Sequence, residues 1–164
     1  MSVVAVKIYK DKIVIGADSF VGFNYDTQLK DKNVKIFSHK EITIGTVGYT
    51  TDCSLMRVFS RDKKPSRSDE EAMTEYIVEF IDWCKKKDVN YKMESNFMIV
   101  FKSKAFLVAG LYVKQIKKYE AMGAGMNMAQ TALALGKSVR EALEIACELS
   151  IYCEKPLNIY EIKK

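Results

Sequence analysis

Runs of β-branched residues occur in blocks along this chain, and amphipathic helical segments lie between the blocks. The first block contains "SVVAVKIY" and "KIVIGADS" around "KDK", then "VKIF" and "EITIGTVG" around "SHKE". Val and Ile runs joined by short polar turns are typical of antiparallel hairpins. Two helical segments follow, then about four strands, two more helices and a closing strand. This order predicts an α+β fold in four layers, αββα, in which two antiparallel sheets are flanked by helix pairs.

The helices show their own sequence signals. In the second one, the apolar residues between Met73 and Cys84 keep the spacing of a single buried face. Capping boxes mark two helix starts, Ser68 with Glu71 and Ser138 with Glu141. The expected helices span residues 50–61, 68–87, 126–136 and 138–153.

The other segments are assigned as strands or loops. "FVGFNYDTQLKDKN" is polar, contains Gly and is expected to be a loop. "SNFMIVFKSKAFLVAG" is expected to be a hairpin that turns near "KSK", and "LYVKQIKKYEAMGAG" to be a second pair of strands. Pro156 ends the last helix, and "LNIYEI" is expected to close the fold as a strand. We find no internal repeat, so residues 1–164 are predicted to form a single domain.

Composition limits the class of function. The chain is 48% hydrophobic with a net charge of +5, which is typical of a globular protein with a solvated, mildly basic surface. Aromatic residues do not alternate with the basic ones, so we expect no nucleic-acid partner. No apolar run reaches 18 residues, and lysines interrupt the N-terminal apolar segment. We therefore expect neither a membrane span nor a signal peptide.

The cysteines and the histidine argue against a metal site. Four cysteines are present without a Cys-x-x-Cys pair, and His39 is the only histidine. We expect no metal and no cofactor. The cysteines are predicted to be reduced thiols, which indicates a cytoplasmic protein.

Four residues near the strand ends carry a candidate chemistry. Ser2 follows the start methionine, Asp18 ends the second strand in "GADS", and Lys35 lies in "NVKIF". Gly45 and Gly48 lie in "TIGTVGYTTD", where glycine indicates a close backbone approach or a bend.

These residues, their order and the later segment "YEAMGAGMNMAQTALALG" resemble the proteasome β-subunit family, in particular the bacterial proteasome-like peptidase that works with an unfoldase ring. The resemblance covers nearly the whole chain. The family's acidic residue follows its N-terminal nucleophile by sixteen positions, as Asp18 follows Ser2. The resemblance implies an N-terminal-nucleophile hydrolase fold.

The resemblance also implies a role for each site residue. After Met1 is removed, Ser2 would be the nucleophile and its own α-amine the general base, because an α-amine has an unperturbed pKa of about 8. The Lys35 ammonium would lower the pKa of that amine, and Asp18 would hold Lys35 charged. The best match to the family's oxyanion-binding glycine is Gly45, with Gly48 as the second glycine of the pattern. The implied substrate is a peptide or unfolded protein, the implied assembly is a homo-oligomeric ring, and the implied partner is an ATP-dependent unfoldase.

Three departures from the family pattern keep other functions open. The nucleophile would be serine rather than threonine, no propeptide precedes Ser2, and Ala124 in "GAG" replaces a serine that supports the α-amine in the family. If Met1 is retained, Ser2 has no free amine, and the chain would be an inactive structural or regulatory subunit. A small-molecule amidase of the same superfamily is a third reading.

Overall fold

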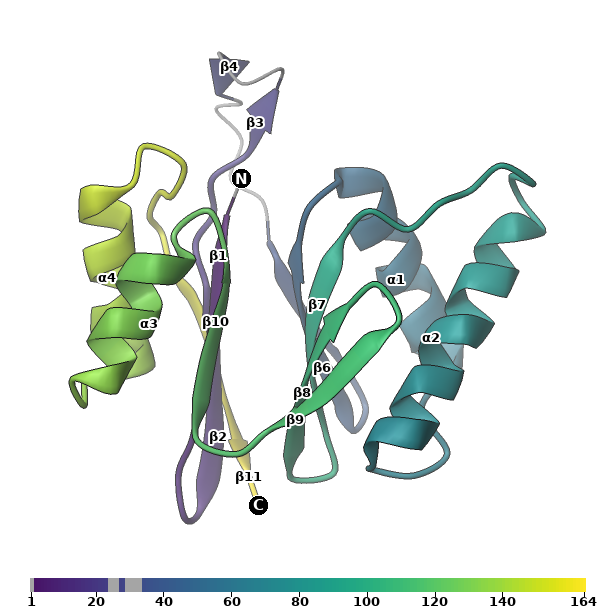
Figure 1. Cartoon of the computed structure of the whole chain (residues 1–164), viewed down its shortest axis with the longest axis horizontal. Helices are drawn as coiled ribbons and strands as arrows, with labels where there is room; N and C mark the ends of the chain where they lie inside the picture. The colour runs from purple at the N-terminus through teal and green to yellow at the C-terminus, as the bar shows by residue number, and fades with distance from the viewer. Residues whose placement is uncertain (1, 24–26, 29–33) are drawn as a thin grey trace.

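The computed structural model describes residues 2–23, 27–28 and 34–164, and in this part of the chain two antiparallel sheets face each other. A helix pair covers the outer face of each sheet, so the layers follow the order helix, sheet, sheet, helix (Figure 1). The four-layer α+β architecture expected from the sequence is confirmed.

The first sheet has the strand order β10-β1-β2-β11. Its centre is the expected hairpin of β1 (Val3–Ile8) and β2 (Lys12–Ala17). The closing strand β11 (Asn158–Lys163) pairs with β2, and β10 (Tyr119–Gly123) pairs with β1. Every pairing in this sheet is antiparallel.

The second sheet has the order β5-β6-β7-β8-β9 and is a meander of sequential strands. Its strands are bounded as β5 (Ile36–His39), β6 (Ile42–Val47), β7 (Asn96–Phe101), β8 (Lys104–Ala109) and β9 (Tyr112–Ile116). Each strand pairs antiparallel with the next. The strands are joined by turns, except that β6 and β7 are joined through α1 and α2, and this connection re-enters the sheet at the end where β6 left it.

Two strand expectations are corrected. "LYVKQIKKYEAMGAG" does not form a pair, because β9 extends the second sheet and β10 crosses to the first sheet. Beside β1, Ala121 of β10 is buried under α3 and α4, and Met122 is buried between the two sheets. The segment expected to be a loop contains the short strands β3 (Gly22–Phe23) and β4 (Thr27–Gln28), while its residues 24–26 and 29–33 lie outside the described residues.

The helices are α1 (Thr50–Asp62) and α2 (Glu70–Lys85) on the second sheet, and α3 (Met126–Ala134) and α4 (Val139–Leu149) on the first. None of them, within the described residues, is long and apolar enough to cross a membrane.

The two predicted capping boxes have different outcomes. The box of Ser138 with Glu141 is present at the start of α4. At α2 the N-cap is instead Asp69, whose carboxylate accepts from the Ala72 amide at 2.9 Å. Ser68 donates to the carbonyl of Phe101 at 2.8 Å, because a tertiary partner on β7 competes for its hydroxyl.

The core forms between the sheets and beneath each helix layer. Small residues of α4, among them Ala142 and Ala146, are fully buried against the first sheet. A larger aromatic group lies under α1 and α2, where the rings of Phe59 and Phe80 are 5.4 Å apart. Between the sheets, Val4 and Ile15 pack against Ile36 and other apolar residues. The contact between the β1–β2 hairpin and the β5–β6 hairpin therefore fixes how the ends of these strands meet.

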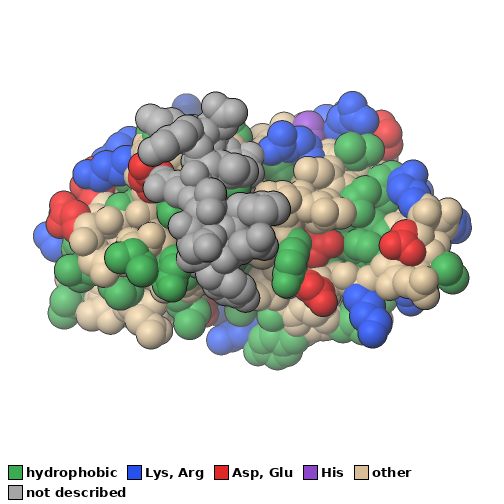
Figure 2. All heavy atoms as spheres, turned by 90° about the horizontal axis from the view of Figure 1, so that it is seen from above, with side chains coloured by type: hydrophobic (Ala, Val, Ile, Leu, Met, Phe, Trp, Pro, Cys, Tyr) green, Lys and Arg blue, Asp and Glu red, His purple; other side chains and the backbone are tan. Residues whose placement is uncertain are grey.

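Surface charge is mixed on the face seen from above. Figure 2 shows Lys and Arg side chains interspersed with Asp, Glu and hydrophobic side chains over the visible, described part of this face. Some surface charges are paired, as in Lys64 with Glu41, 2.8 Å apart.

Candidate active site

The candidate site lies where four strand ends converge. In the β1–β2 hairpin, Val4 pairs with Ala17, so the beginning of β1 and the end of β2 are neighbours. Ser2 and Asp18 are the next residues outward on these strands. In the same way, Lys35 directly precedes β5, next to the end of β6. Antiparallel pairing therefore brings Ser2, Asp18 and Lys35 to one end of the sandwich.

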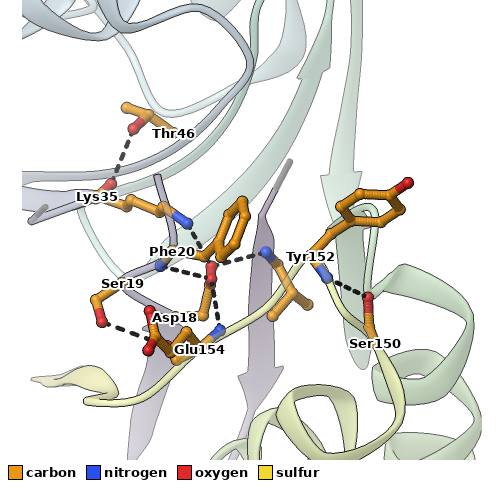
Figure 3. Close-up of polar contacts among 9 residues, drawn as sticks. Asp18, Ser19, Phe20, Lys35, Thr46, Ser150, Tyr152 and Glu154 are labelled. Atoms are coloured by element: carbon orange, nitrogen blue, oxygen red, sulfur yellow. Dashed lines mark hydrogen bonds and ion pairs between the residues drawn. The ribbon is translucent and has the colours of Figure 1, made fainter. Parts of the chain in front are cut away.

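Asp18 organises this end of the molecule through its carboxylate. The side chain is fully buried, and Oδ1 accepts from the Val3 amide at 2.9 Å and from Lys35 Nζ at 2.7 Å. Oδ2 accepts from the amides of Phe20 at 2.9 Å and Glu154 at 3.2 Å. Figure 3 shows these donors converging on one carboxylate. Four donors compensate for the cost of burying this charge.

Lys35 is held at both its side chain and its backbone. The residue is only 5% exposed, and the Thr46 amide and hydroxyl both donate to its carbonyl, at 2.9 and 3.1 Å. Burial lowers the pKa of the Lys35 ammonium below its usual value, although the neighbouring Asp18 acts to raise it. Lys35 is therefore a buried cation that releases its proton more readily than a surface lysine does.

The backbone of Ser2 is fixed by its neighbours. Ser2 is 4% exposed, and its carbonyl accepts from the Gly125 amide at 3.3 Å. The turn at Gly123 approaches so closely that an added Cβ there would collide with the Ser2 carbonyl oxygen. Gly123 has a φ of +98°, a conformation that glycine adopts without a steric penalty. The exposed Ala124 lies in this turn, so the turn holds Ser2 through an amide even without the family's serine.

Ser2 and Lys35 line a common cavity of about 50 Å³. Its other walls come from the segment that leads into β3, the end of β6 and the first turn of α1, namely Phe20, Val21, Gly22, Thr46, Gly48, Thr50 and Cys53. Cys53 was not expected here, because helical spacing alone does not show which face of a first turn meets a cavity. Burial raises the pKa of its thiol, so Cys53 is protonated near neutral pH.

The two glycines of the strand end lie in different surroundings. Gly45 is inside β6, and an added Cβ would lie 2.7 Å from Val4 Cγ1, in the core between the sheets. Gly48 follows β6, lines the cavity and has a φ of +128°. The structure thus brings Ser2, Asp18, Lys35 and Gly48 together and leaves Gly45 in the strand interior.

No metal site is evident around these residues. Within residues 2–23, 27–28 and 34–164, no group of three or more His, Cys, Asp or Glu side chains is arranged to hold a metal ion. The expectation that the protein uses no metal or cofactor stays a prediction.

The chain resembles known proteins over nearly its whole length. No protein-family model matches it. A Campylobacter concisus protein named ATP-dependent protease subunit HslV is 30% identical over 170 residues, which cover 94% of this chain and 93% of that protein. A Campylobacter curvus protein of the same name is 30% identical over 169 residues, covering 94% and 92%.

Solved structures with low sequence identity share the fold. Thiobacillus denitrificans BPH in complex with epoxomicin superposes with a TM-score of 0.84 at 16% identity and covers 98% of both chains. Eukaryotic HslV from Trypanosoma brucei has a TM-score of 0.77 at 16% identity and covers 99% of both.

The fold that these structures share, together with the 30% identical relatives named protease subunits, defines the class of proteasome-like N-terminal-nucleophile peptidases. Within that class, this chain belongs to the HslV family.

Proposed function

We propose that this protein is a peptidase subunit whose nucleophile is the Ser2 hydroxyl, exposed as the N-terminal residue when Met1 is removed. The observation that carries the proposal is the buried ion pair of Asp18 and Lys35, 2.7 Å apart, beside the cavity that Ser2 lines. Burying two charges is costly, and a stable fold does not require it. Their position next to the first strand therefore favours a chemical role.

The reaction follows from the groups present. The free α-amine of Ser2 accepts the proton of its own hydroxyl, and the oxygen attacks the carbonyl carbon of the scissile peptide. The tetrahedral intermediate collapses to an ester on Ser2, and the departing amine takes the proton. Water then hydrolyses the ester, and the α-amine of Ser2 again acts as the base. The charged Lys35 favours the neutral, basic form of the amine, and Asp18 keeps Lys35 in position.

The oxyanion is best assigned to the Gly48 amide. Gly48 lines the cavity together with Ser2, whereas Gly45 lies in the packed interior of β6. An oxyanion donor contributes roughly 2.7–4 kcal/mol to transition-state stabilisation in other enzymes. This assignment replaces the preference for Gly45 that sequence matching alone suggested.

The assembly and the partner are proposed from the relatives. The Campylobacter proteins are named subunits of an ATP-dependent protease. We infer that copies of this chain form a homo-oligomeric ring that takes peptides or unfolded proteins delivered by an ATP-dependent unfoldase. The cytoplasmic location expected from the sequence stays a prediction.

An inactive subunit is the second candidate, and Ala124 favours it. Alanine cannot donate the hydrogen bond that the family's serine gives to the α-amine. A chain that also kept Met1 would lack the base altogether. The small-molecule amidase reading has less support, because the curated relatives are named protease subunits.

The deciding experiment combines intact mass with peptide hydrolysis. We expect the untagged protein to lack the mass of one methionine and to cleave a fluorogenic peptide. Ser2→Ala and Lys35→Ala should abolish cleavage. The control Ser38→Ala should not, because it removes only a β5 hydroxyl that is hydrogen-bonded to Thr43 on β6 at 3.0 Å. Retained Met1 with no cleavage above the Ser2→Ala background would support the inactive subunit. Cleavage that is unchanged in Ser2→Ala would overturn Ser2 as the nucleophile.

A further inference from the structure

A second buried carboxylate lies close to the cavity without lining it. Asp52 is the third residue of α1 and is 3% exposed. In the same helical turn, Thr50 and Cys53 line the cavity. Asp52 reaches instead to the segment that connects α2 to β7, which runs along the same end of the second sheet (Figure 1).

The Asp52 carboxylate gathers three neutral donors from that connection. Oδ1 accepts from the Tyr91 hydroxyl at 2.8 Å. Oδ2 accepts from the amides of Glu94 and Ser95, both at 2.9 Å. The position in the first turn of α1 adds the favourable field of the helix N-terminus. Asp52 therefore fixes the backbone of residues 94 and 95 against α1.

Ser95 transmits this anchoring to the residue after Gly48. Its hydroxyl accepts from the Tyr49 amide at 2.8 Å and lies 3.3 Å from the Tyr49 carbonyl, to which it donates. Tyr49 is the N-cap of α1 and makes no side-chain cap of its own. The Ser95 hydroxyl thus holds both polar backbone groups of Tyr49.

Ser95 also packs directly on Gly48. A Cβ added to Gly48 would lie 2.5 Å from Ser95 Oγ and 2.7 Å from Ser95 Cα. This contact leaves no room for a side chain, and the φ of +128° at Gly48 disfavours one independently. The Gly48–Tyr49 peptide group therefore takes its orientation from Ser95, whose hydroxyl accepts from the Tyr49 amide.

We propose that Asp52 is a positioning residue for the peptidase reaction, which through Ser95 holds the Gly48–Tyr49 turn so that the Gly48 backbone faces the cavity. The inference rests on the proposed function, because it assigns to Asp52 the support of the oxyanion site. Asp52 does not touch the reacting atoms and acts only through the turn.

The first test is Ser95→Ala, which removes the hydroxyl that holds Tyr49 and leaves the Asp52 carboxylate with its amide donors. We expect kcat for a fluorogenic peptide to fall on the order of 10- to 100-fold, since an oxyanion donor is displaced. KM should change by less than about 3-fold, because ground-state binding is retained. The matched control is Ser60→Ala, which removes a buried hydroxyl that donates to Arg57 on α1 and should leave kcat unchanged.

Asp52 itself is tested by loss and rescue. Asp52→Ala should lower kcat at least as much as Ser95→Ala does. Asp52→Asn should restore most of it, because the amide oxygen can accept from Glu94 and Ser95 while its nitrogen donates to the Tyr91 oxygen. If Asp52→Ala does not fold, Ser95→Ala and Asp52→Asn still decide the question.

Binding of inhibitors separates positioning from general stability. A peptide aldehyde forms a tetrahedral adduct with an oxyanion, whereas the matching peptide alcohol does not. We expect Ser95→Ala to weaken aldehyde binding at least about 10-fold more than alcohol binding. If Ser95→Ala keeps the wild-type kcat and the wild-type ratio of aldehyde to alcohol affinity, the positioning role of Asp52 is overturned, and the proposed function is left standing. The wild-type protein could instead match Ser2→Ala, with no peptide cleavage and no preference for the aldehyde over the alcohol. That result would overturn the proposed function and this inference together.

Discussion

At the scale of single residues, the two members of the Asp18–Lys35 ion pair depend on each other to different degrees. Asp18 accepts from three backbone amides besides Lys35, so its carboxylate keeps most of its donors when the lysine is removed. An asparagine at position 18 cannot match this environment. Both oxygens of Asp18 face a backbone N–H, so either orientation of the amide places its NH₂ group against another donor.

This asymmetry predicts different stabilities for the two variants. Asp18→Asn should lower the free energy of unfolding by on the order of 3–5 kcal/mol, because it leaves Lys35 buried without its anion. Lys35→Met should cost less, because Asp18 retains the amides of Val3, Phe20 and Glu154. Urea denaturation at neutral pH measures both values. An equal or larger loss in Lys35→Met would contradict the assignment of Asp18 as the anchor.

The two glycines provide the second residue-scale prediction. Gly48→Ala should abolish peptide cleavage, because a Cβ there meets Ser95 and the φ of +128° is strained for alanine. Gly45→Ala should cost about 1–3 kcal/mol of stability through overpacking against Val4 and should keep most of kcat. Kinetics on the folded fraction compare the two. Lost kcat in Gly45→Ala with activity retained in Gly48→Ala would return the oxyanion role to Gly45.

The site could be predicted from the sequence only where spacing along the strands was sufficient. Ser2, Asp18 and Lys35 follow from hairpin ends and family spacing, and they are brought to one end of the fold. The choice between Gly45 and Gly48 depends on which one leaves the strand, and backbone dihedrals are not visible in spacing. Asp52 and Ser95 are far apart in sequence, so the contact between them appears only in three dimensions.

At the scale of elements, the helix starts show how tertiary contacts compete with local signals. Ser138 and Glu141 satisfy each other, with the Ser138 amide donating to Glu141 at 2.9 Å. The Ser68–Glu71 pattern looked equivalent, yet the Ser68 hydroxyl donates to Phe101 and Asp69 caps the helix. Likewise, the pairing of β9 and β10 was mispredicted, because local β propensity does not indicate which sheet a strand joins.

The α4 capping box predicts a pH-dependent contribution to stability. Hydrogen bonds from the Ser138 backbone and side chain, and from Lys137, lower the pKa of Glu141 from 4.5 to about 2. A depressed carboxyl pKa stabilises the fold above pH 4.5, and the effect is lost as pH falls toward 2. The stability difference between wild type and Glu141→Gln should therefore be largest above pH 4.5 and shrink as pH approaches 2. Urea unfolding across this pH range is the measurement, and a difference independent of pH would contradict the box.

At the scale of the whole molecule, the order of strand blocks and helix pairs was enough to predict the layers. Strands joined by short turns share a sheet in β1–β2, β5–β6, β7–β8 and β8–β9, whereas the short connection from β9 to β10 passes from one sheet to the other. The crossing before β10 is what places the turn at Gly123 against Ser2. The layers could be predicted from local patterns. The detailed geometry around Ser2 could not, because it depends on the passage of the chain from β9 in one sheet to β10 in the other.

The last prediction concerns assembly, which follows from the proposed function and from the exposed surface. The α3–α4 layer exposes Leu135, Leu149 and Ile151 to 78%, 67% and 81%. Leu135 and Leu149 line one surface hollow together with Met128 and Ile145. Exposed apolar patches of this kind are typical of contact sites in oligomers. We expect sedimentation velocity at micromolar concentration to show an assembly of at least about six copies with closed symmetry. A clean monomer would contradict the ring. It would leave the chemistry of Ser2 to be judged by the Ser2→Ala comparison, because the cavity is formed within one chain.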